Sequence, residues 1–238
     1  DPFYRNIFLL TNATQKADYW ASTIQLSKDF ESGLSLFAAY TQSRARDLDT
    51  SGGSQAVSLW TQTVQENRNN PELSYANHDI PNRVIASLSH KVKNTTLSLF
   101  YQGSNAGRFS YTYSGNFGDS SNRLMYIPNN ASELFFQPFT VGGVLYTQDM
   151  QREMLDNYIN QDAYLSANRG SIAERNGALL PWVNQFDLRL THEIQLAKQN
   201  NQRLQLSLDI LNFGNLLNSD WGVPQFPNQR NLLNYRGT

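Results

Sequence analysis

The chain of 238 residues is long enough for one domain with a sizeable core, and its composition excludes several classes of protein. A net charge of -1 gives no general attraction to nucleic acid, so we expect no nucleic acid among its partners. The lack of cysteine excludes disulfide bridges and thiolate metal sites. Charged residues make up only 16% of the chain, so Ser, Thr, Asn and Gln supply most of its polarity.

Alternation of apolar and polar residues predicts β-strands along much of the chain. It is clearest where Leu204, Leu206 and Leu208 oppose polar neighbours. Ile85 and Phe100 interrupt the polar face of their strands, and the first strand alternates poorly. In chain order, we expect strands near residues 3–11, 19–29, 34–44, 83–92, 95–104, 183–196 and 203–213.

The predicted connections alternate between short and long. Only Lys93 and Asn94 separate two strands, which predicts a hairpin with Val92 opposite Thr95 and Leu88 opposite Leu99. Residues 45–81 and 105–181, by contrast, form long loops. Short turns at one end and long loops at the other are typical of outer-membrane barrels. The sequence therefore predicts an all-β fold: part of an antiparallel transmembrane β-barrel, about seven strands of a larger one, with long extracellular loops.

One of these loops contains a helical pattern. Apolar residues recur at helical spacing in 149–166, and Asn168-Arg169-Gly170 supplies a stop. We expect a short amphipathic helix that packs on the aromatic residues of its own loop. Its apolar residues are Met150, Met154, Leu155, Tyr158 and Ile159, and the expected aromatic partners are Phe135, Phe136 and Phe139.

Aromatic residues also gather near the predicted strand ends. They are Tyr19, Trp20, Phe30, Trp182 and Trp221. Such residues form girdles at the two membrane interfaces of a barrel, whereas in a soluble sandwich they would fill the core.

No catalytic constellation can be assembled, and we expect no enzyme activity, catalytic residues or cofactors. His78, His90 and His192 lie far apart in the sequence, and no common nucleophile or phosphate-binding motif occurs. The segment from Asp47 to Gly52 begins like a calcium loop, but Ser58 stands where the bidentate Glu belongs, so we predict no metal site. Ligand-binding residues stay unassigned. Arg189 and Asp209 should form a cross-strand pair on the polar face.

Several motifs in order resemble one known family, along nearly the whole chain. These are Phe109-Ser110-Tyr111-Thr112-Tyr113-Ser114-Gly115, Leu124-Met125-Tyr126-Ile127-Pro128, Tyr164-Leu165, Asn168-Arg169-Gly170, Glu174-Arg175-Asn176-Gly177, Pro181-Trp182, Asp209-Ile210-Leu211-Asn212-Phe213, Asn215-Leu216-Leu217-Asn218 and Trp221-Gly222. They are similar to TonB-dependent outer-membrane receptors of the Bacteroidetes type, especially the Oar-like group. The acidic, Gly-rich turn of that family is reduced here to 118–122, which puts a cation-stabilised loop in doubt.

The resemblance implies a barrel of about 22 strands around an N-terminal plug, with nutrient uptake energised by the TonB complex. Residues 1–238 would be the C-terminal part of that barrel, without a recognisable plug domain or TonB-contacting segment. An open sheet has unpaired edges, so we expect these residues to belong to a longer chain or larger assembly. The expected partners are outer-membrane lipid, the protein's own plug domain, the TonB complex and a surface lipoprotein. The expected location is the bacterial outer membrane.

Other functions stay open at this point. The barrel could be a scaffold without import activity that serves secretion or assembly. A soluble carbohydrate-binding β-sandwich is a further alternative, although its loops would ordinarily be short at both ends. An outer-membrane hydrolase would need a Ser, a His and a carboxylate brought together by the fold.

Overall fold

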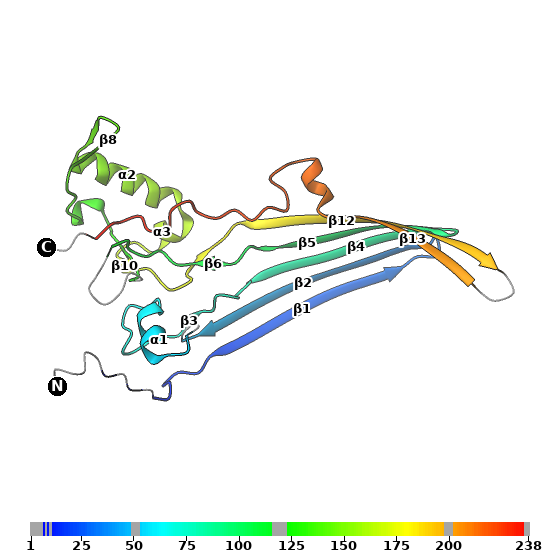
Figure 1. Cartoon of the computed structure of the whole chain (residues 1–238), viewed down its shortest axis with the longest axis horizontal. Coiled ribbons are helices and arrows are strands. Elements are labelled where there is room, and N and C mark those ends of the chain that lie inside the picture. The colour runs from blue at the N-terminus through cyan, green and yellow to red at the C-terminus, as the bar shows by residue number, and fades with distance from the viewer. Residues whose placement is uncertain are drawn as a thin grey trace.

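A long antiparallel sheet dominates the computed structural model, which describes residues 7, 9, 11–48, 53–115, 123–197 and 202–235 (Figure 1). Its strands are ordered β1-β2-β4-β5-β12-β13, and β3 pairs with β2. Their bounds are β1 Asp18–Asp29, β2 Leu34–Asp47, β3 Ser74–Tyr75, β4 Asn82–Val92, β5 Thr95–Asn105, β12 Trp182–Ala197 and β13 Gln202–Ile210. Among the described residues β1 and β13 are the edges, and the sheet does not close. An open antiparallel sheet of this kind is what part of a barrel would show.

The six long strands occupy segments that alternation indicated, with small shifts at their ends. β2 continues to Asp47, and β13 stops at Ile210 where Asn212 adopts a left-handed conformation with φ 50°. The strand expected near 3–11 lies largely outside the described residues. Its described positions Ile7, Leu9 and Thr11 are not in a strand.

The register keeps apolar side chains on one face. A single row of partners crosses the sheet through Leu36, Leu88, Leu99, Leu188 and Ile210. The predicted pairs of Leu88 with Leu99, Val92 with Thr95 and Arg189 with Asp209 are confirmed.

The apolar face is exposed within the described part of the chain. Residues with exposed side chains on it include Ile24, Leu26, Leu88, Leu97, Leu190, Leu204, Leu206 and Leu208. So many exposed leucines on one face of a sheet need an apolar surrounding, which the described residues do not supply.

The turns between β1 and β2 and between β4 and β5 lie at one end of the sheet, while α-helices lie at the other (Figure 1). Gly33 has φ 82° in the β1–β2 turn, and a Cβ there would lie 2.5 Å from the backbone oxygen of Lys91. Only glycine allows this close approach without strain. Lys93, in the two-residue turn, also has a positive φ of 52°.

The two long connections contain short elements. The first holds α1 Ala56–Gln62, and the C-terminal segment holds η2 Phe213–Leu216. The second holds β6 Arg108–Phe109, β7 Tyr126–Ile127, η1 Ala131–Glu133, β8 Phe139–Val141, β9 Val144–Tyr146, α2 Gln148–Gln161, α3 Ala163–Ala167, β10 Ser171–Ile172 and β11 Ala178–Leu179. None of the helices in the described residues is both long and apolar enough to cross a membrane.

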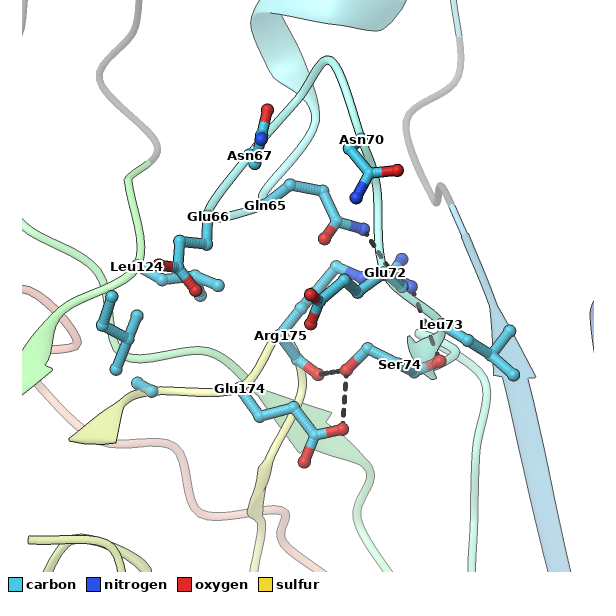
Figure 2. A pocket seen from close by; sticks show the side chains of 12 residues that line it. Gln65, Glu66, Asn67, Asn70, Glu72, Leu73, Ser74, Leu124, Glu174 and Arg175 are labelled. Atoms are coloured by element: carbon cyan, nitrogen blue, oxygen red, sulfur yellow. Dashed lines mark hydrogen bonds between the residues drawn. The ribbon is translucent and has the colours of Figure 1, made fainter. Parts of the chain in front are cut away.

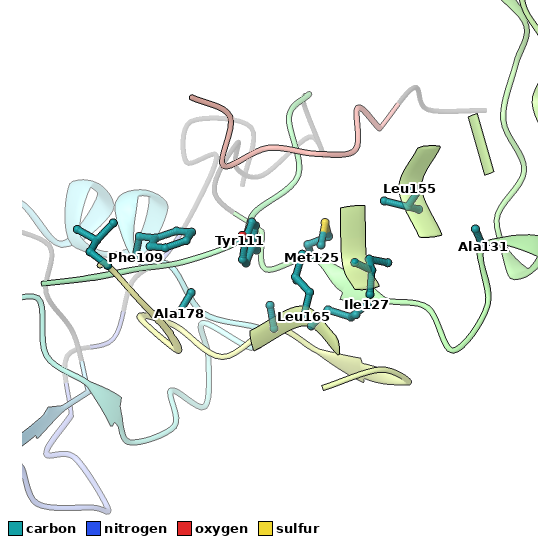
Figure 3. Packing of buried hydrophobic residues seen from close by; sticks show 11 residues of the cluster. Phe109, Tyr111, Met125, Ile127, Ala131, Leu155, Leu165 and Ala178 are labelled. Atoms are coloured by element: carbon teal, nitrogen blue, oxygen red, sulfur yellow. The ribbon is translucent and has the colours of Figure 1, made fainter. Parts of the chain in front are cut away.

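The principal hydrophobic core lies in the second connection rather than on the sheet. We call the described residues of 106–181, with Leu232 and Leu233, the loop cap. Its buried side chains form one cluster: Phe109, Tyr111, Met125, Ile127, Ala131, Leu155, Ile159, Leu165, Ala173, Ala178 and Leu180 (Figure 3). The Tyr111 hydroxyl donates to Asp162 Oδ2 at 2.7 Å, so the one polar group of that ring is satisfied. The connection is therefore a folded body with its own core.

The single helix expected over 149–166 was wrong in two respects. The helix breaks at Asp162, because this side chain caps α3 by accepting a hydrogen bond from the amide of Leu165 at 2.8 Å. Leu155 and Ile159 alone form the buried stripe of α2, whereas Met150 and Met154 stay exposed.

The expected aromatic partners also differ. Phe135 is 78% exposed, and Phe139 stacks on Tyr146 within the β8–β9 hairpin instead. Phe136 alone packs against the core cluster.

Candidate functional site

Aromatic and amide side chains bound the apolar face toward the loop end. The Tyr40 hydroxyl donates to Asn82 Oδ1 at 2.6 Å, and the Tyr101 hydroxyl donates to Asn184 Oδ1 at 2.8 Å. The indole nitrogen of Trp182 also donates to Asn184 Oδ1, at 3.0 Å. Rings with one apolar body and one hydrogen-bonded tip suit a boundary between apolar and aqueous surroundings.

The remaining expected interface aromatics divide between the two faces. Trp20 lies on the apolar face of β1, but its neighbour Tyr19 lies on the polar face because successive strand residues alternate. Trp221 packs on Phe186 with ring centroids 5.9 Å apart, so the segment after β13 extends the aromatic boundary.

Basic and histidine side chains bound the same face toward the short turns. Lys28 Nζ lies 5.8 Å from the ring centre of Phe30. His90 Nε2 lies 3.3 Å from the carbonyl oxygen of Ser32, and His192 Nδ1 contacts the hydroxyl of Thr95 at 2.9 Å. The two histidines thus have separate partners and do not converge on one site.

The apolar band between these boundaries is comparable in height with the apolar band of outer-membrane barrels. About eight residues separate Asn184 from His192, or about 26 Å along a strand at roughly 3.3 Å per residue. A tilt of about 40° reduces this to about 20 Å, close to the roughly 25 Å apolar band of outer-membrane barrels.

Ion pairs cross the opposite, polar face. Arg189 Nη2 donates to Asp209 Oδ2 at 3.2 Å, and Arg203 Nη1 lies 3.6 Å from Glu193 Oε2. The predicted pairing of Arg189 with Asp209 is therefore present on the expected face.

The loop cap is anchored over the loop end of this polar face. Asp47 lies on the same face of β2 as Ala45 and Ser43. Its carboxylate is 2.8 Å from Nη2 of Arg175, whose side chain is only 1% exposed. Arg175 Nη2 also donates to the backbone oxygen of Asp47. Residues 128 positions apart thereby hold the cap against the strand.

A second ion pair supports the same junction. Asp79 is buried and accepts a hydrogen bond from the amide of Ala45 at 2.6 Å. Its other oxygen accepts one from Arg108 Nε at 2.5 Å. The guanidinium of Arg108 in turn lies 3.6 Å from the ring centre of Tyr75. The two long connections therefore dock on each other as well as on the sheet.

Between the two connections lies an open polar pocket of about 390 Å³ (Figure 2). One wall comes from residues 65–74, including Glu66, Asn67 and Glu72, and the other from Ile172, Glu174 and Arg175. The hydroxyl of Ser74 ties the walls together, because its one proton is shared between Glu174 Oε1 at 2.9 Å and the carbonyl oxygen of Arg175 at 2.7 Å.

A second depression of about 370 Å³ adjoins the pocket and shares Gln65, Glu66 and Asn67 with it. Trp60 also lines this depression, with the guanidinium of Arg68 5.4 Å from its ring centre. The two hollows thus have one wall in common.

No ligand-binding residue was assigned from the sequence, so the pocket is a structural finding. Of the motifs that carry the family resemblance, Glu174-Arg175-Asn176-Gly177 contributes residues to the pocket wall. The calcium-like segment does not build a site within the described residues: Asp47 pairs with Arg175, and 49–52 lie outside them. Across the described ranges, no group of three acidic or histidine side chains is placed to hold a metal ion.

Comparison with known protein families identifies the kind of domain. Residues 2–230 match the family described as "Outer membrane beta barrel domain", which is nearly the whole chain. Neither the search of curated proteins nor that of solved structures found a match.

Proposed function

Since this chain belongs to the outer membrane β-barrel domain family and lies in the bacterial outer membrane, we propose a role in nutrient uptake. It forms part of the wall and the outer gate of a receptor whose transport is energised by the TonB complex. The strands separate lipid from a water-filled interior. The long connections, on the outer side, bind the nutrient and control its entry.

The observation that carries the proposal is the docking of the loop cap over the polar face. Arg175 joins the cap to Asp47, the last residue of β2, and Arg108 joins it to the buried Asp79; the pocket lies at this junction. A scaffold needs only a wall, whereas a receptor needs a folded surface across the opening with a place for a ligand. Binding loops on a rigid frame are the common arrangement for such surfaces.

The partners in this proposal are outer-membrane lipid, the protein's own plug domain, the TonB complex and a surface lipoprotein. No catalytic step is assigned to the chain, because uptake needs binding and gating only. The resemblance to TonB-dependent receptors supports the energy source, through the motifs from Phe109 to Trp221.

Growth of a deletion strain tests the proposal. The strain, its complemented form and a TonB-deficient strain are grown on peptides, glycans, ferric siderophores or cobalamin as the limiting nutrient. We expect deletion and loss of TonB to slow growth on the same nutrient, and complementation to restore it. Equal growth of deleted and complemented cells on all four, with an altered set of secreted proteins, would favour the scaffold instead.

A further inference from the structure

The pocket between the two long connections has an excess of negative charge. Glu66 and Glu72 line it without an ion pair to any described residue, whereas Glu174 accepts the hydroxyl of Ser74 and interacts at longer range with the charge of Arg46. Among the described residues that line it, Arg175 is the cationic one, and its guanidinium is paired with Asp47 at 2.8 Å; Arg68 and Arg123 line the adjoining depression. Carboxylates around a concave surface concentrate their field there, which favours a cationic ligand.

Arg175 supplies a second and independent indication. Its side chain crosses the floor of the pocket between Gln65 and Ser74 (Figure 2). Although it is 1% exposed, its Nε and Nη1 have no hydrogen-bond partner among the described residues. A buried donor without an acceptor is unfavourable, and an oxygen atom brought in from the pocket would satisfy it.

The spacing of these groups indicates an extended ligand rather than an ion. Within the described part of the chain, acidic side chains do not converge to hold a metal. In Figure 2 the carboxylates of Glu66, Glu72 and Glu174 instead stand at different points around one open space, with the amides of Asn67 and Asn70 at its upper rim. The volume of about 390 Å³ falls in the range of small-ligand sites.

We propose that this pocket binds peptides that carry positively charged side chains. Ammonium or guanidinium groups of the peptide face Glu66, Glu72 and Glu174, and peptide carbonyl oxygens accept from the rim amides and from Arg175. A neutral sugar offers acceptor oxygens but leaves the three carboxylates uncompensated. This assignment rests on the proposed receptor function, and it names the substrate class of that site.

Binding of labelled peptides to the full-length protein in detergent micelles tests the assignment. The probes are Ala-Lys-Ala-Lys, Ala-Glu-Ala-Glu and, as a neutral sugar, maltohexaose. The test variant combines Glu66→Gln with Glu72→Gln, which removes charge while keeping shape. The matched control is Glu153→Gln on the exposed side of α2, outside the pocket.

We expect the lysine peptide to bind tighter than the glutamate peptide, and its affinity to fall with rising salt. The double variant should weaken it about two- to thirtyfold, as two exposed charge pairs would, and the control should not. Unchanged amide exchange in the loop cap would show that the double variant is folded.

Equal affinity for both peptides, or a lysine peptide insensitive to the double variant, overturns the assignment. If maltohexaose binds instead and the double variant weakens it, the peptide assignment fails while the receptor function stands. If the lysine peptide binds as expected but deletion leaves growth on every nutrient unchanged, the assignment stands and the import function fails.

Discussion

Replacing Arg175 with alanine should open the loop cap without unfolding the sheet. The change removes the ion pair to Asp47 and the hydrogen bonds to the backbone oxygens of Asp47 and Ser74. Breaking a fully buried pair costs about 3–5 kcal/mol. Asp47 keeps 23% of its side chain exposed and can be hydrated after the change, so we expect about 3 kcal/mol. That corresponds to about a hundredfold rise in the open population of the cap.

Hydrogen exchange of the intact protein measures this opening directly. The amides of Gly170 and Ala173 bond across the cap to Ile127 and Met125, both at 2.7 Å, and should exchange about a hundredfold faster in the variant. Amides of β5 and β12 should keep their protection. Arg230→Ala is the control, because Arg230 is exposed and has no ion pair or hydrogen bond among the described residues. A change below about fivefold in the cap, or an equal change in the sheet, would refute the reasoning.

Three further changes test other parts of the structure. Leu208→Arg places a charge on the apolar face and should lower the free energy of urea unfolding in lipid vesicles by about 2–4 kcal/mol. Ser207→Arg, on the polar face, should change this free energy little. Equal effects of the two substitutions would contradict the face assignment. Tyr111→Phe should weaken the cap by about 1–2 kcal/mol in amide exchange, because it removes the hydrogen bond to Asp162. Burial and that hydrogen bond raise the pKa of Tyr111, so the contribution of Tyr111 to cap stability should be constant from neutral pH to about pH 10 and fall above it; a Phe variant with the same fall would count against this cause. Gly33→Ala should lower the free energy of thermal unfolding by about 1–3 kcal/mol, since φ is 82° and a Cβ would meet the carbonyl oxygen of Lys91 in β4. An unchanged unfolding transition would contradict this.

The sheet could be predicted from the sequence because its signals are local. A period of two places Leu204, Leu206 and Leu208 on one face whatever surrounds the strand. Turn length then fixes which residues pair, as Val92 with Thr95 across Lys93 and Asn94.

The loop cap could not be predicted, because its contacts join distant segments. From the sequence alone, Arg175 would be expected on the surface. In the structure it is buried, because Asp47, 128 positions away, is its ion-pair partner. Asp162 lies between α2 and α3. The helix breaks there because the Asp162 side chain accepts a hydrogen bond from the amide of Leu165, and the spacing of apolar residues does not reveal this. The core residues Tyr111, Met125 and Leu165 come from separate segments with no shared period, and only Leu165 lies in a helix.

The most direct test of the central claim is the environment of successive residues in β13. Nitroxide labels are placed one at a time at positions 204–209, in the full-length protein in lipid vesicles, and their access to oxygen and to a water-soluble nickel reagent is measured. The account predicts an alternation with a period of two. Labels at Leu204, Leu206 and Leu208 should be most accessible to oxygen, and labels at Gln205, Ser207 and Asp209 to nickel. Equal nickel access on both faces, or protection of the leucine positions from both reagents, would contradict it.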